Sequence, residues 1–277
     1  MRIDPELLRS TLVERLGVAL AAEERASSDG QRVVLVPTDI PESSSFRLEL
    51  LLGWRSVDVE VVSGAYSRGL VAAMGRADAR QREVFRGFLS AAVGKGAEVG
   101  FLLNGAECSY ADDSIWALVW ERFRLKVIRH PVVPNGNSSG EVAAAVVPWV
   151  TIALGAVLSV LPLEADEEQA RLEGAKREVL ATRYERDPVN RALCLEIHGT
   201  VCKACGFDFG DTYGEIGDGF IEVHHAEQLS EQGGEAVAVN PLTDLIPLCS
   251  NCHSMAHRRT PPYTVEELRE IIDGQKP

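Results

Sequence analysis

Four cysteines in the last third of the chain have the spacing of metal ligands. They form two C-x-x-C pairs, Cys202 with Cys205 and Cys249 with Cys252, and residues 206–248 separate the pairs. Four thiolates suit a closed tetrahedral zinc site, to which each C-x-x-C turn contributes two sulfurs. In a chain whose start does not resemble a secretory signal, this spacing favours a metal over disulfides, redox pairing or chance. We therefore predict a structural zinc with no coordination position left for catalysis, and an insertion between its two turns.

Four of the chain's six histidines lie within this insertion or just after it. His224 and His225 end the largely apolar run of residues 220–223, which predicts a strand whose neighbouring side chains point to opposite faces. His253 and His257 follow the second cysteine pair at the i,i+4 spacing that places two side chains on one face of a helix. We predict a second metal site built from this strand and this helix. The alternative is that the histidines only cap and pack, which suits an isolated histidine better than four.

The composition indicates a soluble, globular and acidic chain. Hydrophobic residues make up 45% and charged residues 25% of the 277 residues, which is enough for packed cores. The formal net charge of −13 argues against a protein that wraps nucleic acid by bulk attraction, so a contact with DNA would be local and assisted by cations. The expected location is the cytoplasm. Cys108 and Cys194 are expected to be ordinary packing residues.

The helices and strands that the sequence pattern predicts indicate an α+β fold with two domains. Residues 1–165 are expected to form an N-terminal mixed α/β domain of unknown family with a recognition or regulatory role. Residues 166–185 are expected to be a charged helical linker, and residues 186–277 the metal-binding domain. Hydrophobic periodicity in the first domain predicts helices at 5–27 and 65–93 and strands at 32–36, 46–62, 97–105 and 124–132. In the second domain, Pro188 opens a helix and Thr264 with Glu267 forms the capping box of the last one.

Residues 142–163 carry no charge and are long enough to span a bilayer. Pro148, Gly155 and Pro162 interrupt this stretch, its flanks are acidic, and neither end has a Lys or Arg anchor. We therefore expect a buried core helix. A membrane or partner-binding segment is the alternative.

Residues 186–273 resemble the HNH endonucleases of ββα-metal fold that carry a four-cysteine zinc site, and in particular the McrA-like modified-cytosine restriction nucleases. The resemblance is carried by RDP at 186–188, CKACG at 202–206, FIEVHH at 220–225, TDLIPLCSNCH at 243–253 and the final His257. It covers about a third of the chain and its combined motifs are highly specific. It implies that His225 is the general base that activates water, and that His224, His253 and His257 hold a catalytic divalent ion such as Mg²⁺ or Mn²⁺.

Asp244 stands where the family has the Asn that braces the loop behind the catalytic histidine. Asp accepts hydrogen bonds but cannot donate them as Asn does, which is a departure from the family pattern. Asn251, inside the second cysteine pair, is the alternative for this position, and the spacing to His253 favours Asp244.

The resemblance implies a metal-dependent DNA endonuclease of bacterial defence that acts on foreign or modified DNA. Arg258, Arg259 and Arg186 are candidates for contacts with DNA phosphates. A homodimer is left open and no membrane is expected. The alternatives are a non-catalytic zinc module that binds DNA or protein, and a nuclease effector that a signal unleashes through the first domain.

The aromatic residues of the first domain allow two interpretations. A reader of extruded bases needs an aromatic-lined pocket. Trp54, Tyr66, Trp116 and Trp120 could line one, or they could belong to the core. Residues 120–130 are the most basic run of this domain, and their alternating charge fits either a sheet face that meets phosphates or an edge strand guarded by charge, which we favour.

Overall fold

The computed structural model describes residues 1–38, 40–134, 136, 138–161, 188–226, 242–259 and 261–275. The chain divides into two compact units, Met1–Leu180 and Ala181–Pro277. The predicted linker helix at 166–185 and the candidate Arg186 lie outside the described residues, and so does the predicted boundary between the two domains. The domain boundaries therefore remain a prediction.

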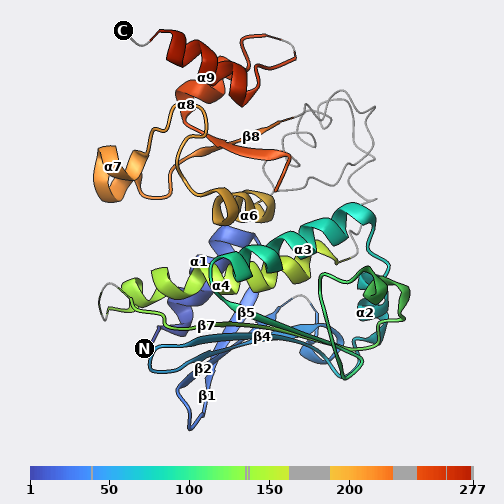
Figure 1. The fold of residues 1–277 in the computed structure, drawn as a ribbon. Helices are drawn as coiled ribbons and strands as arrows, with labels where there is room; N and C mark the ends of the chain where they lie inside the picture. The colour runs from blue at the N-terminus through green and yellow to red at the C-terminus, as the bar shows by residue number, and fades with distance from the viewer. Residues whose placement is uncertain are drawn as a thin grey trace, which may run out of the picture. The chain divides into compact units, whose positions relative to one another are not determined.

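The first unit is built on a seven-stranded antiparallel sheet with the strand order β1-β2-β3-β4-β7-β5-β6 (Figure 1). The strands are β1 Leu20–Arg25, β2 Gln31–Pro37, β3 Phe46–Leu52, β4 Val57–Ser63, β5 Glu98–Leu103, β6 Ala106–Cys108 and β7 Phe123–Arg129. Period-two alternation determines which face is buried. In β3, for example, Phe46, Leu48, Leu50 and Leu52 are buried, while the residues between them are half-buried.

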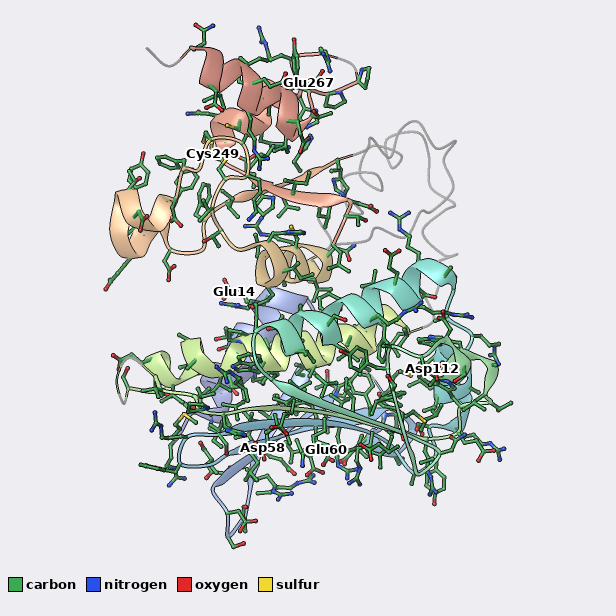
Figure 2. The ribbon with its side chains drawn as sticks, in the orientation of Figure 1. Glu14, Asp58, Glu60, Asp112, Cys249 and Glu267 are labelled. Atoms are coloured by element: carbon green, nitrogen blue, oxygen red, sulfur yellow. The ribbon has the colours of Figure 1, made fainter. Side chains whose placement is uncertain are left out.

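Helices cover one face of this sheet. They are α1 Pro5–Leu16, α3 Ala79–Gly94 and α4 Ser139–Ser159, with the short α2 Arg68–Met74 before α3 (Figure 1). The side chains of Asp58 and Glu60 point from β4 to the opposite face (Figure 2). An antiparallel sheet with one packed and one polar face is common, and together with the helices it confirms the predicted α+β class.

Helix α4 accounts for the uncharged stretch. Its N-terminus is closed by a capping box in which Ser138 and Glu141 exchange side-chain and backbone hydrogen bonds. The helix is long and apolar enough to cross a membrane, but 72% of its apolar window is buried within the protein. Since α4 contacts α1, α3 and β4, it is a core helix of the first unit, as the sequence favoured.

Two predictions for the first unit are wrong in part. The helix predicted at 5–27 ends at Leu16, because Gly17 takes a left-handed conformation with φ 66° and its N–H closes the helix on the Val13 carbonyl. Residues 20–25 instead form strand β1. The basic strand β7 is not an edge strand, since it pairs with β4 on one side and β5 on the other.

The four aromatic residues of interest fall into two classes. Trp116 and Trp120 are buried and stack on each other with ring centroids 4.8 Å apart, so they belong to the core. Trp54 and Tyr66 are 85% and 81% exposed. Only these two could meet a ligand without unfolding the core.

The second unit contains a short antiparallel ribbon and a helix that follows it. Its elements are α6 Pro188–His198, α7 Phe209–Tyr213, a 3₁₀ turn Gly214–Gly217, β8 Glu222–His225, β9 Leu245–Leu248, α8 Ser250–Ala256 and α9 Val265–Gly274. The ribbon pairs Glu222 with Leu248 and His225 with Leu245. The predicted capping box is present at α9, where Thr264 and Glu267 exchange hydrogen bonds. The order of β8, β9 and α8 is a ββα arrangement.

Candidate active site and metal centres

The two C-x-x-C turns bring four sulfurs together. The Sγ atoms of Cys202, Cys205, Cys249 and Cys252 all lie within 4.8 Å of one another. A backbone bond from Lys203 N–H to the Pro247 carbonyl, 2.9 Å long, ties the first turn to the end of β9, just before the second. Three of the four cysteines are buried and Cys205 is exposed.

The pKa values of these thiols agree with a site that holds a metal cation. Burial opposes ionisation of Cys202, but hydrogen bonds from the backbone N–H groups of Cys205, Cys249 and Ala204 outweigh it and lower the pKa of this thiol to about 7. Burial and the neighbouring sulfurs raise the pKa of Cys252. Four sulfurs this close repel one another as thiolates unless a cation lies between them. Four thiolates around one point are the donor set of structural zinc.

Three imidazoles form a second cluster. His224 lies on β8, His253 on α8 and His257 directly after α8, and one ring nitrogen from each lies within 4.8 Å of the other two. The Nε2 atoms of His253 and His257 are 3.3 Å apart. The ring centroids of the three residues are 4.9–5.3 Å apart. Because one nitrogen of each ring lies within 4.8 Å of the other two, the three histidines can serve as ligands to one cation.

The environment of His224 fits this role. The residue is only 4% exposed, and its Nδ1 has no hydrogen-bond partner among the described residues. Burial, followed by the charges of the neighbouring histidines, lowers its pKa to about 4. The ring is therefore neutral at physiological pH, which is the form that binds metals.

Glu222 is a part of this site that the histidine pattern did not reveal. It lies two residues before His224 and so on the same face of β8. Its carboxylate is hydrogen-bonded to Nδ1 of His253, which leaves Nε2 of that ring for a cation. The hydrogen bond of Ser250 and then the contact with His253 lower the pKa of Glu222, so the carboxylate is ionised. The sequence signal that could have revealed Glu222 is its position two residues before His224, a predicted metal ligand on the same strand.

Asp244 lies opposite the strand end that carries His225. Its carbonyl accepts a 2.8 Å hydrogen bond from the N–H of Ala226, the residue after His225. Its carboxylate accepts a 2.7 Å hydrogen bond from the Thr243 hydroxyl. The main chain at Asp244 thus braces the end of β8 with an acceptor that any residue could supply. Asn251 is instead exposed in the first turn of α8.

The two arginines after His257 differ in their surroundings. The guanidinium of Arg259 donates to both carboxylate oxygens of Glu267 at 2.6 Å and stacks 4.1 Å from the centre of the Tyr263 ring. These contacts connect the end of α8 to α9, which argues against Arg259 as a phosphate ligand. Arg258 is exposed.

Both remaining cysteines lie outside the metal clusters. Cys194 is buried in α6, and burial raises the pKa of its thiol to about 12. Cys108 is half-buried at the end of β6. Their placement agrees with packing roles.

Comparison with known proteins locates the family resemblance in the second unit. Residues 202–259 match the family model described as HNH endonuclease. Searches of the curated proteins and of the solved structures gave no match. The matched range starts at the first cysteine of the four-cysteine cluster and includes all three clustered histidines. The part of the chain at residues 202–259, which includes the four-cysteine cluster, therefore resembles an HNH domain.

Proposed function

We propose that this chain is a metal-dependent DNA endonuclease whose active site lies on the β8–β9 ribbon and helix α8. The observation that carries the proposal is the convergence of His224, His253 and His257, whose ring nitrogens lie within 4.8 Å of one another. His224 also directly precedes His225 in the chain. A structural site needs only the four sulfurs. A second, separate set of three imidazole ligands leaves coordination positions for a phosphate oxygen and water.

The positions of His224 and His225 on β8 are the basis for the separate roles that we assign to them. His224 and His225 are neighbours on β8, so their side chains point to opposite sides of the ribbon. We assign cation binding to His224, together with His253 and His257, and proton transfer to His225. His225 would accept the proton of the water that attacks the phosphodiester, a contribution of general base catalysis. When bound, the cation would supply Lewis-acid stabilisation of the charge on the phosphate and on the leaving oxygen.

Glu222 and Asp244 would act through the histidines. The carboxylate of Glu222 fixes the tautomer and orientation of His253, as outer ligands of metal sites generally do. The backbone of Asp244 holds the strand end on which His225 stands. Both are positioning residues in this proposal.

Local charge would guide the substrate. The chain carries a formal net charge of −13, which repels a polyanion as a whole. Arg258 is exposed directly after His257 and is our candidate for a phosphate contact near the cation. Because Arg259 is held by Glu267, we do not assign it to DNA.

The resemblance of the second unit to McrA-like nucleases supports a finer proposal. The enzyme would act in the cytoplasm of a bacterium, against foreign or modified DNA. The first unit would then supply recognition or regulation. A homodimer would let two such sites cut both strands.

Incubation of supercoiled plasmid with the zinc-loaded protein and Mg²⁺ or Mn²⁺ tests this function. We expect conversion to nicked and linear forms that depends on the added ion. A panel of unmodified, methylated, hydroxymethylated and phosphorothioated DNA tests the finer proposal, which predicts a preference among the four. If the zinc-loaded protein cuts none of them with either ion, the non-catalytic zinc module is the better account. Equal cleavage rates on all four kinds of DNA would reject only the finer proposal that the enzyme acts on modified DNA.

A further inference from the structure

Apolar side chains gather on the surface of the second unit, on α7 and the 3₁₀ turn that follows it (Figure 1). Tyr213 is 56%, Ile216 88% and Phe220 50% exposed. The ring of Phe209 joins two of these residues, because it stacks on Tyr213 with ring centroids 6.0 Å apart and meets Phe220 edge-on at 4.8 Å. We call Phe209, Tyr213, Ile216 and Phe220 the α7 patch. Single exposed apolar residues are ordinary, but a group of them marks an interaction site.

The backbone holds the α7 patch in a fixed shape. The side chain of Asp208 caps α7. Gly217 is buried, and a Cβ at this position would lie 2.2 Å from the Phe209 carbonyl oxygen. Only glycine therefore lets the 3₁₀ turn lie this close to α7. The N–H of Phe220 bonds to the Gly217 carbonyl at 3.1 Å and closes the turn, which presents Ile216 to solvent.

The α7 patch is the outer end of a row of aromatic rings. Phe207 and Phe209 pack against the core that contains three of the clustered cysteines, and their rings meet at 4.9 Å. These two inner rings therefore have a role in the packing of the unit. Tyr213 and Ile216 lie beyond them and keep more than half of their surface exposed, so burial within the unit does not account for their apolar character.

Carboxylates accompany the α7 patch. Asp211, Glu215 and Asp218 are exposed, and no ion pair joins them to a basic residue in the described parts of the chain. Residues 207–222 contain no Lys, Arg or His. This face therefore repels a nucleic-acid phosphate and disfavours a second copy of the same acidic face. Cations that flank an apolar surface would complement it.

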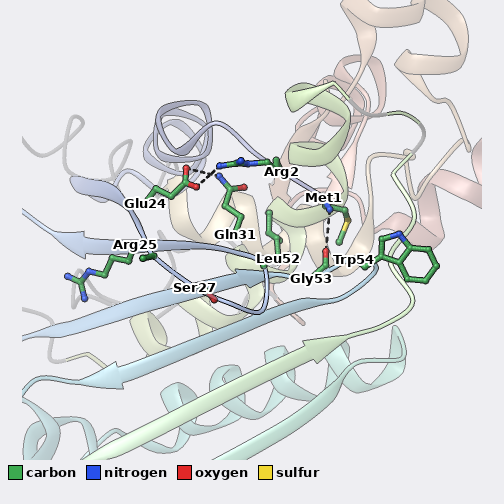
Figure 3. Close-up of a pocket in the computed structure, with 11 residues that line it drawn as sticks. Met1, Arg2, Glu24, Arg25, Ser27, Gln31, Leu52, Gly53 and Trp54 are labelled. Carbon is green, nitrogen blue, oxygen red and sulfur yellow. Dashed lines mark hydrogen bonds and ion pairs between the residues drawn. The ribbon is translucent and has the colours of Figure 1, made fainter.

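The pocket of the first unit differs from the α7 patch because its charges are satisfied within the protein. It has a volume of about 550 Å³ and lies where the first residues of the chain meet the turns β1–β2 and β3–β4 (Figure 3). Arg2 pairs with Glu24 at 2.7 Å, and Arg25 pairs with Glu23. The ring of Trp54 points away from the pocket (Figure 3). We therefore assign this pocket no ligand.

We propose that the α7 patch docks a basic, amphipathic segment of a partner protein. The exposed members of the patch would be buried against the apolar face of this segment, and its lysines or arginines would pair with the three carboxylates. Aromatic anchors inside a polar rim are the usual composition of a protein interface. The inference does not rest on the proposed nuclease activity, because the α7 patch includes none of the clustered histidines.

Fluorescence anisotropy with the full-length, zinc-loaded protein tests this docking. The probe is a labelled helical peptide with leucines on one face and lysines on the other. We expect it to bind, and we expect about tenfold weaker binding when glutamates replace its lysines or serines replace its leucines. In the protein, Ile216→Ser should weaken binding about tenfold, the loss expected when one large aliphatic side chain is no longer buried.

A second variant tests the charges, and a third is the control. Replacement of Asp211, Glu215 and Asp218 by their amides should weaken binding of the leucine–lysine peptide and reduce its salt dependence. Ile271→Ser is the matched control, because Ile271 is 49% exposed on α9 of the same unit but lies outside the α7 patch. It should bind the peptide as the wild type does. Zinc content and thermal unfolding should be unchanged in Ile216→Ser, whose replaced side chain is almost fully exposed.

Three results would overturn the proposal. They are no binding of the leucine–lysine peptide to the wild type, undiminished binding to Ile216→Ser, and an equal loss in Ile271→Ser. Sedimentation of the full-length protein tests the remaining occupant, since a dimer that Ile216→Ser abolishes would assign the α7 patch to a second copy and reject the basic partner. Plasmid cleavage is measured separately, so failure of the docking and failure of the nuclease activity are distinguishable.

Discussion

Replacement of His225 by alanine is expected to slow plasmid cleavage by about 10²–10⁴-fold, the usual contribution of a positioned general base. The imidazole is not one of the three clustered ligands, so zinc content and binding of the second ion should stay as in the wild type. Initial rates of nicking at saturating Mn²⁺, together with metal content and thermal unfolding, provide the measurement.

His130→Ala is the control for this experiment. His130 is a largely exposed histidine of the first unit that pairs with Glu98 at 3.6 Å, far in sequence from the site. Its removal should leave cleavage unchanged. If the His225→Ala protein nicks plasmid as fast as the His130→Ala protein, His225 is not the base.

Replacement of Cys249 by serine is expected to release the zinc and unfold the second unit. The core around the cluster is small and includes three of the cysteines themselves, with Ile221, Leu248, Val265 and Leu268 as its larger members. Binding of structural zinc contributes about 10–16 kcal/mol in zinc-finger peptides, which exceeds what such a core can replace. Elemental analysis of zinc per chain and hydrogen exchange of β9 and α8 would measure the two effects.

Cys194→Ala is the matched control, because Cys194 is a buried thiol of the same unit outside the cluster. It should keep the zinc and the slow exchange of β9. Exchange in the strands of the first unit should be unaffected by either variant. Retention of both zinc and protection by Cys249→Ser would contradict a structural role for this cluster.

Local features of the sequence predicted the two clusters that the structure brings together, because short-range spacing determines them. A C-x-x-C turn brings two sulfurs together, and i,i+4 spacing places His253 and His257 on one side of α8, whatever the rest of the fold does. The capping box at Thr264 is local in the same sense. A short apolar run likewise predicted β2, and alternating apolar residues predicted β3 and β4.

Features that depend on contacts between residues far apart in the sequence could not be predicted from local spacing. The basic strand β7 reads as an edge strand by its charges, yet it lies inside the sheet because β4 and β5 pair with it from distant parts of the sequence. Residues 20–25 continue the helical spacing of α1, but pairing with β2 and the left-handed Gly17 override it. The contact of Glu222 with His253 joins residues 31 positions apart. The pocket near Trp54 requires three separate segments to meet.

The number of divalent ions that each chain binds tests the central claim most directly. Zinc-loaded wild-type protein would be titrated calorimetrically with Ni²⁺, which imidazole binds more tightly than Mn²⁺, and elemental analysis would verify that the zinc stays in place. We predict one zinc and one further ion per chain. His257→Ala should lose the second ion but keep the zinc, and Glu222→Gln should weaken the second ion about 10–100-fold. A wild-type chain that holds zinc alone, or a His257→Ala chain that binds Ni²⁺ as the wild type does, would contradict a catalytic cation held by these three histidines.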